Sequence, residues 1–162
     1  MLRFIDTDVT DAHAHALLTD YFADRTRSFP VAQGGYRTTF PDRAAFIPPA
    51  GVFLLVVTDG PGNRDNAVGC GGIRRIKADA AGETRYEVKH LWLQPRERGK
   101  GAGRALLQEL EARARLFGAT ELVLDTNVSL LAADGLYRST GFEEIPAYND
   151  NPNATTWFRK RL

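Results

Sequence analysis

The sequence has one cysteine, Cys70, among 162 residues. An internal disulfide is therefore excluded, and a reducing compartment such as the cytoplasm is the simplest expectation. The sequence also lacks an apolar run of about 18 residues, the length that a membrane-spanning helix needs. The first eight residues lack the apolar core of a signal peptide. We therefore expect a cytoplasmic protein with no membrane segment.

An excess of charge of one sign is also missing. Lys and Arg number 21 and Asp and Glu number 20, which gives a net charge of +1. This balance predicts no non-specific binding to nucleic acid or to an anionic membrane. The basic run 159–161 has no aromatic platform beside it, which also disfavours a nucleic-acid binder. We predict no metal ion among the ligands.

The composition is that of one globular domain over residues 1–162. Hydrophobic residues make up 43% and charged residues 25% of the chain, which excludes a disordered or fibrous protein. A chain of this length buries roughly 70% of the surface that it would expose unfolded, so its core needs no disulfides. No repeat, low-complexity tract or linker divides it.

Strand and helix signals alternate along the chain in the order of a mixed sheet. Strands are expected at 2–5, 52–57, 67–77, 84–93, 122–124, 142–145 and 156–161, and helices at 11–25, 41–46, 102–117 and 130–140. A turn over 60–66 makes the second and third strands an antiparallel hairpin, and 26–40 reads as a long loop. The predicted fold is α/β (α+β), with a central, mostly antiparallel mixed sheet of about six or seven strands and about four flanking helices.

The most informative segment is a turn with glycine at positions 99, 101 and 103, between the strand ending at Leu93 and an amphipathic helix. Such a turn exposes backbone N–H groups at a helix N-terminus, where the macrodipole favours an anion. The alternative is a glycine-rich loop with a solvated basic face. A Walker loop is excluded because Gly101 follows Lys100, and a dinucleotide fingerprint because Arg104 occupies its third glycine position.

The pattern Arg98-x-x-Gly101-x-Gly103 resembles the pyrophosphate loop of the GNAT superfamily of acyl-CoA-dependent N-acyltransferases. Further along, the segment 136–142, Leu-Tyr-Arg-Ser-Thr-Gly-Phe, is similar to that family's Leu-Tyr-x-x-x-Gly-Phe. The resemblance covers about residues 84–145 and implies a sheet splayed in the middle.

The resemblance implies acetyl-CoA as the cosubstrate. Pantetheine would pair with the backbone of Leu91, Trp92 and Leu93, although Leu91 and Leu93 can also be ordinary core residues. The pyrophosphate would bind the backbone amides of Arg98, Gly99, Lys100, Gly101, Ala102, Gly103 and Arg104.

The resemblance also implies two catalytic residues. Tyr137 matches the general acid that protonates the departing CoA thiolate, and its alternative is a packed helix tyrosine that is hydrogen-bonded elsewhere. Glu87 lies six residues before Leu93, where some members carry the general base, and its alternative is a solvent-facing strand residue. His90 is the fallback base.

The chain departs from the family pattern at Leu130, where many relatives have an asparagine that holds pantetheine. Asn127 or the Ser129 hydroxyl can replace it, although Ser129 is a good candidate for a helix cap. Tyr148 and Asn149 lie in a turn cluster that can border the acceptor pocket.

We hypothesise direct transfer of an acetyl group from acetyl-CoA to a primary amine of a small molecule. The alternatives are a protein or peptide acceptor and, in a different class, a non-catalytic CoA-binding module. Cys70 lies on a mid-sheet strand without a partnered base, which disfavours an acyl-enzyme. Arg27, Tyr36 and Arg37 can recognise an anionic or aromatic acceptor or be merely solvated. The resemblance allows a homodimer.

Overall fold

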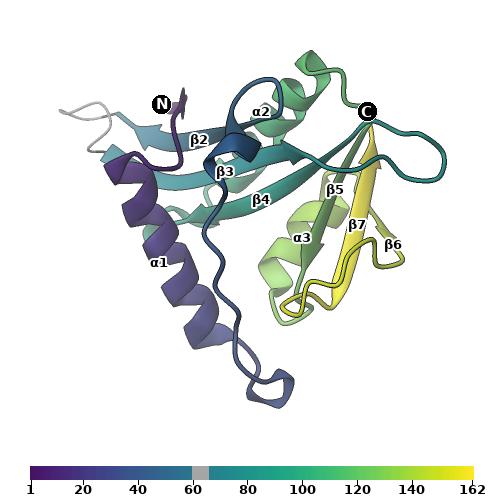
Figure 1. Cartoon of the computed structure of the whole chain (residues 1–162). Coiled ribbons are helices and arrows are strands. Elements are labelled where there is room, and N and C mark those ends of the chain that lie inside the picture. The colour runs from purple at the N-terminus through teal and green to yellow at the C-terminus, as the bar shows by residue number, and fades with distance from the viewer. Residues whose placement is uncertain (60–65) are drawn as a thin grey trace.

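The computed structural model describes residues 1–59 and 66–162, and their core is a seven-stranded sheet in the order β1-β2-β3-β4-β5-β7-β6 (Figure 1). The strands are β1 (Leu2–Asp6), β2 (Gly51–Thr58), β3 (Ala67–Arg75), β4 (Arg85–Leu93), β5 (Glu121–Thr126), β6 (Glu143–Ile145) and β7 (Thr156–Arg161). Neighbouring strands of this sheet are antiparallel, except that β4 and β5 are parallel. The mostly antiparallel mixed sheet is therefore confirmed.

The described residues contain three α-helices, not about four. They are α1 (Ala12–Ser28), α2 (Ala102–Leu116) and α3 (Leu131–Ser139), and the short 3-10 helices are η1 (Val31–Gln33), η2 (Arg43–Phe46) and η4 (Pro95–Glu97). Where a helix is expected over 41–46, the structure has only the four-residue 3-10 helix η2, which Asp42 caps. Helix α1 runs three residues into the segment expected to be a loop. The turn expected over 60–66 lies, except for Asn66, outside the described residues.

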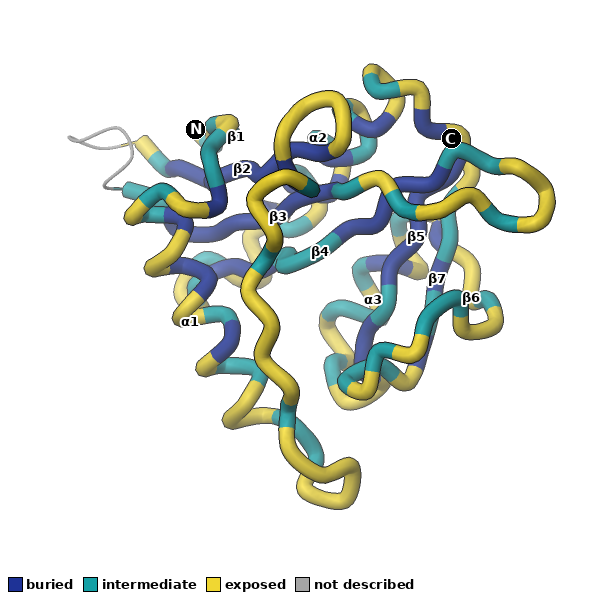
Figure 2. Tube along the Cα trace, viewed as in Figure 1, coloured by how far each residue is buried: buried dark blue, intermediate teal, exposed yellow. Residues whose placement is uncertain are grey.

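The apolar run of β2 is buried on both faces of the sheet, as Figure 2 shows for this strand. Its side chains alternate between two cores: Leu54 packs in the cluster that contains α2, and Leu55 in the cluster that contains α1. The apolar stripe of α2 is also confirmed, since Leu106, Leu107 and Leu110 are almost completely buried. Each such leucine contributes about 1.5–3 kcal/mol by leaving water.

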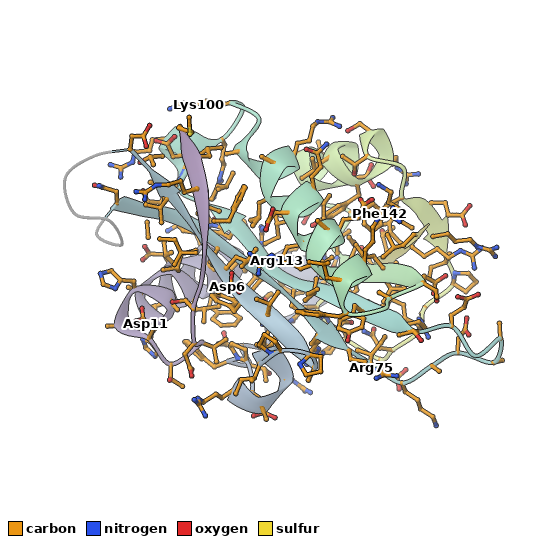
Figure 3. All side chains as sticks on the ribbon, turned by 90° about the horizontal axis from the view of Figure 1, so that it is seen from above. Asp6, Asp11, Arg75, Lys100, Arg113 and Phe142 are labelled. Atoms are coloured by element: carbon orange, nitrogen blue, oxygen red, sulfur yellow. The ribbon has the colours of Figure 1, made fainter. Side chains whose placement is uncertain are left out.

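An ion pair fixes α2 across the sheet. Arg113 donates from Nη1 to Asp6 on β1 at 2.7 Å and from Nε to Glu109 at 2.8 Å. Figure 3 shows the Arg113 and Asp6 side chains pointing toward each other. This partly exposed ion pair adds to the buried leucines that hold α2 against the sheet.

The parallel strands β4 and β5 are paired over three residues only, and the last of these pairs is Glu87 with Val123. Beyond it the two strands diverge (Figure 1). A bulge adds to the divergence: between Cys70 and Gly72 on β3 the chain advances two residues, whereas from Lys89 to Trp92 on β4 it advances three. The edge of β4 that faces β5 is therefore unpaired beyond Glu87, and the splayed sheet is confirmed.

Candidate active site

A cavity of about 490 Å³ lies where β4 and β5 diverge. Its floor comes from residues 88–91 of β4 and its far wall from residues 125–130 and from α3. The second half of α1, the following segment 36–42 and the tail 149–154 complete it. Two of these segments are joined, because the Asn153 side chain bonds to both the N–H and the C=O of Arg37, each at 2.8 Å.

Tyr137 of α3 lines this cavity. Its ring is 7% exposed and lies beside those of Phe142 and Phe158. The ring is therefore packed, as the alternative interpretation expects, but its hydroxyl makes none of the expected hydrogen bonds to any residue in the described ranges. Burial raises the pKa of Tyr137, which keeps the phenol protonated at neutral pH.

Glu87 is 1% exposed, so the interpretation of a solvent-facing glutamate is wrong. Arg74 donates to its Oε1 from Nε at 2.9 Å and from Nη2 at 2.7 Å, and Tyr148 donates to its Oε2 at 2.7 Å. Arg74 lines the cavity, whereas Glu87 lies behind it. A proton can therefore reach Glu87 from the cavity only through its neighbours or a water molecule.

Asp125 is the buried carboxylate that lines the cavity itself, and the sequence reasoning missed it. Lys89 contacts Asp125 at 3.1 Å, and Asn149 donates to it at 2.7 Å. Burial would raise the pKa of Asp125, but the charge of Lys89 and the Asn149 hydrogen bond outweigh burial and lower it. The sequence did contain a signal for Asp125, because a charged residue that directly follows the buried segment 122–124 is a candidate for a site at the end of that strand.

His90 lies in the bulge of β4 with a φ of 56° and lines the cavity. Its imidazole lies beside the rings of Tyr21 and Phe22, and its Nδ1 is buried without a hydrogen bond. Burial, helped by the charges of Lys89 and Arg74, lowers the pKa of His90 to about 3. The imidazole is therefore neutral at physiological pH and is a weak base.

The glycine turn has the geometry of an anion site. Gly99 and Gly101 have φ values of 74° and 86°, and no described atom lies within 4 Å of the position that a Cβ would take on either residue. The first hydrogen bond of α2 runs from Ala105 N–H to Gly101 C=O at 3.0 Å. Among the described residues, no backbone carbonyl accepts from the N–H groups of residues 99–104, which are therefore available to a ligand. The prediction for Arg98 is wrong in this respect, because its N–H already donates to Pro95 C=O at 3.2 Å.

The basic side chains of this turn bind other parts of the protein. Arg98 donates to Leu93 C=O at 2.9 Å and to Asp24 of α1 at 2.8 Å, and Trp92 also donates to Asp24, at 3.0 Å. Arg104 joins the turn to α3, because it donates to the Ser139 hydroxyl at 2.9 Å. Lys100 is exposed at the edge of the molecule (Figure 3). For an anion at this turn, the available contacts are therefore the backbone N–H groups, including those of Ala102 and Gly103.

The residues expected to hold pantetheine have different environments. Leu91 lines the cavity, whereas Trp92 is buried on the α1 side of the sheet and Leu93 on the α2 side. Because the side chains of Trp92 and Leu93 are buried in the core, only the backbone of these two residues can meet a ligand.

Asn127 lines the cavity, but its amide nitrogen donates to Gln33 at 2.7 Å and to Asn153 C=O at 3.1 Å. Its Oδ1 accepts from Ser129 N–H at 3.0 Å. The suggestion that Ser129 caps α3 is wrong: Leu130 is the N-cap residue, and no side chain caps that helix.

A sequence model of the acetyltransferase (GNAT) family matches residues 9–142. The chain belongs to the GNAT family. Among curated relatives of this GNAT chain, an uncharacterised N-acetyltransferase of Schizosaccharomyces pombe is 34% identical over 65% of the chain and 60% of its own length. An IAA acetyltransferase of Azospirillum brasilense is 39% identical over 48% of each protein. The chain thus spans about half of the length of these relatives.

Solved structures of GNAT proteins match the whole GNAT chain. A Klebsiella pneumoniae protein assigned to the acyl-CoA N-acyltransferases is 27% identical with a TM-score of 0.74, and the match covers 100% of this chain and 98% of that one. A GNAT acetyltransferase from Elizabethkingia anophelis with acetyl-CoA bound gives a TM-score of 0.63 at 14% identity, over 99% of this chain and 98% of that one. The second likeness shows the fold alone. In the described ranges, no group of three or more acidic, His or Cys side chains could hold a metal, and no helix could span a membrane.

Proposed function

We propose that this chain is an enzyme that transfers an acetyl group from acetyl-CoA directly to a primary amine. One observation carries the proposal: the Tyr137 hydroxyl has no hydrogen-bond partner in the described residues and lines a cavity beside the unpaired edge of β4. A phenol with no structural hydrogen bond, at the place where the family's general acid stands, is available to donate its proton.

The residues present fit acetyl-CoA. The unpaired edge of β4 at Leu91, Trp92 and Leu93 offers backbone groups to the pantetheine amides, as an added strand would. The open turn at Gly99 and Gly101 gives the pyrophosphate direct access to backbone N–H groups, with no Cβ to keep it away. Asn127 contributes by ordering the segment between β5 and α3, because its own polar atoms are already bonded.

The proton balance assigns the residue roles. An amine with a pKa near about 10.4 must lose a proton before its lone pair forms the new N–C bond. Glu87 takes that proton through water that enters beside Arg74, and Tyr137 gives one to sulfur as the C–S bond breaks. The nitrogen loses its second proton as the amide forms, and that proton restores the Tyr137 phenol. His90 also lines the cavity, but its pKa of about 3 makes it a weak proton acceptor.

Transfer is direct because Cys70 cannot carry the acetyl group. Its side chain is completely buried, its Sγ lies 3.6 Å from the His90 carbonyl, and burial raises the pKa of the thiol. A thiol that stays protonated and does not line the cavity is not a nucleophile there. The same reduced and buried thiol agrees with a cytoplasmic location.

The acceptor is a small molecule in this proposal, not a protein or peptide. The segment 36–42 and the tail 149–154 wall the cavity, and the two hydrogen bonds between Arg37 and Asn153 hold these walls together. An extended peptide would have to separate them.

One observation favours a non-catalytic CoA-binding module: four donor groups, from Arg74, Tyr148 and Asn149, occupy the Glu87 carboxylate. The two functions are separated by incubating the protein with acetyl-CoA and a mixture of amines and peptides, and by measuring products by mass spectrometry and acetyl-CoA affinity by calorimetry. An acetylated small amine supports the proposal, and an acetylated peptide supports a protein or peptide acceptor. Tight binding of acetyl-CoA without any product supports the non-catalytic CoA-binding module.

A further inference from the structure

Four cationic side chains line the cavity, and two of them make no ion pair with any described residue. Lys89 is paired with Asp125, and Arg74 with Glu87. Arg25, by contrast, makes only one contact that orients its guanidinium, which lies over the Tyr21 ring at 5.4 Å from its centroid. Arg37 is held through its backbone alone. A guanidinium without a carboxylate partner is available to bind an external carboxylate.

Aromatic rings surround these two arginines. Tyr21, Phe22, Phe29, Tyr36 and Phe40 all line the cavity. Phe22 meets Phe40 at a centroid distance of 4.8 Å, and Phe29 meets Tyr36 at 5.6 Å. Phe40 is 44% exposed, so part of this apolar surface remains to be covered by a ligand. Rings of this kind contact a flat apolar group well.

We propose that the acceptor is an amine that also carries a carboxylate and an aromatic ring, of which aromatic α-amino acids are the simplest. Arg25 and Arg37 bind the carboxylate, and the rings around Phe22 enclose the aromatic group. This inference rests on the proposed function, since it names the acceptor class of the same cavity.

The position of Arg25 agrees with such a ligand. Burial raises the pKa of Tyr137, and the nearby charge of Arg25 opposes that rise, so the guanidinium lies within electrostatic range of the proposed acid. At the opposite wall, the Asp125 carboxylate offers oxygen atoms to an ammonium group. The remaining wall carboxylate, Asp42, accepts from Ala44 N–H as the cap of η2.

The sequence suggested Arg27 as a residue that recognises the acceptor, but Arg27 does not lie at the cavity. Its Nη2 donates to Asp24 at 3.0 Å, and its side chain does not line the cavity. It is therefore the matched control for Arg25, from the same helix and with the same charge.

The test measures binding to the full chain by calorimetry, with and without CoA. The probes are L-phenylalanine, L-phenylalaninamide, 2-phenylethylamine and L-alanine. We expect L-phenylalanine to bind at least about tenfold more tightly than the other three, because only it carries both groups. Arg25→Gln and Arg37→Gln should each remove most of that preference, whereas Arg27→Gln should keep it. The melting temperature of each variant shows that it is folded.

Three results would overturn the inference: equal affinity for L-phenylalanine and its amide, equal affinity for L-alanine, or an unchanged preference in both Arg25→Gln and Arg37→Gln. Acetylation is then scored separately by mass spectrometry. If 2-phenylethylamine is acetylated faster than L-phenylalanine, the acceptor class is wrong and the acetyltransferase stands. If L-phenylalanine binds with the expected preference but no amine is acetylated, the site stands and the proposed function fails.

Discussion

Tyr148 donates a hydrogen bond to Glu87 Oε2 at 2.7 Å, across 61 residues of sequence. Glu87 belongs to the last residue pair that joins β4 to β5, and Tyr148 lies in the segment between β6 and β7. Burial and the neighbouring Glu87 charge raise the pKa of Tyr148, so its phenol remains a donor. This bond ties the tail that walls the cavity to the point where the sheet opens.

The first prediction concerns Glu87→Gln. Turnover near neutral pH should fall more than acetyl-CoA affinity and should partly recover at high pH, where free amine is abundant. The variant should also lose about 1–3 kcal/mol of unfolding free energy, because Arg74 loses a charged acceptor. Denaturation and pH–rate profiles measure the two effects.

Tyr148→Phe is the control for this variant, since it removes one donor to the same carboxylate but leaves the charge. It should lower stability without the recovery at high pH. Wild-type rates for Glu87→Gln across pH 6 to 9 would remove Glu87 from the mechanism.

The second prediction concerns Tyr137→Phe. Its kcat should fall by about 10²–10⁴, because the hydroxyl acts only as charge grows on sulfur. Its melting temperature should not change, because the hydroxyl makes no hydrogen bond within the described residues. Single-turnover rates, acetyl-CoA affinity and thermal unfolding are measured on the same sample.

Tyr86→Phe is the control, and its expected effects on stability and rate are the opposite of those of Tyr137→Phe. The Tyr86 hydroxyl donates to Pro49 C=O at 2.6 Å, so this variant should lose about 0.5–1.5 kcal/mol of stability and keep its rate. A Tyr137→Phe protein that unfolds early but transfers at the wild-type rate would return Tyr137 to a structural role.

The third prediction compares two glycines at opposite ends of α2. Gly101 and Gly118 have φ values of 86° and 82°, and neither has a described atom near the position of its missing Cβ. Alanine at either position should cost about 1–2 kcal/mol of backbone strain. Only Gly101→Ala should also weaken acetyl-CoA binding, by about tenfold or more, because its methyl group projects where the pyrophosphate approaches. Equal affinities of the two variants in calorimetry would contradict the anion site.

The fourth prediction concerns acid stability. Burial raises the pKa of Asp24, but hydrogen bonds from Trp92, Arg98 and Arg27 hold it at about 2. Because the folded pKa lies below the unfolded value of about 3.9, Asp24 stabilises the fold above that value, and its contribution disappears as the pH falls toward about 2. The loss should be on the order of 1 kcal/mol, since water screens part of these contacts. Urea denaturation from pH 5 to 2 should show a shallower decline for Asp24→Asn, and parallel curves would exclude this role.

Much of the fold could be predicted because its signals are local. Asp11 caps α1, and Gly118 and Gly141 adopt positive φ just after α2 and α3, as their sequence positions suggest. The glycine turn was equally accessible, because its function depends on the backbone of a few consecutive residues.

The contacts of the site were less predictable, because they join segments that are remote in sequence. Glu87 accepts a hydrogen bond from Tyr148, which lies 61 residues later in the chain. Arg25 lines the cavity and Arg27 does not, because only one face of α1 meets it. Helix α3 starts one residue later than a Ser129 cap requires, with Leu130 as its N-cap residue, so the cap expected at Ser129 does not form. A single sequence contains no signal for such pairings.

The bonds between Arg37 and Asn153 use only the backbone of residue 37. Every amino acid except proline has that N–H and C=O, so the side chain at 37 is free to change while the cavity wall keeps its shape. Under the proposed role of the Arg37 side chain in acceptor binding, single substitutions at this position would alter the substrate at little cost in stability. For an engineer, position 37 is accordingly the first place to randomise.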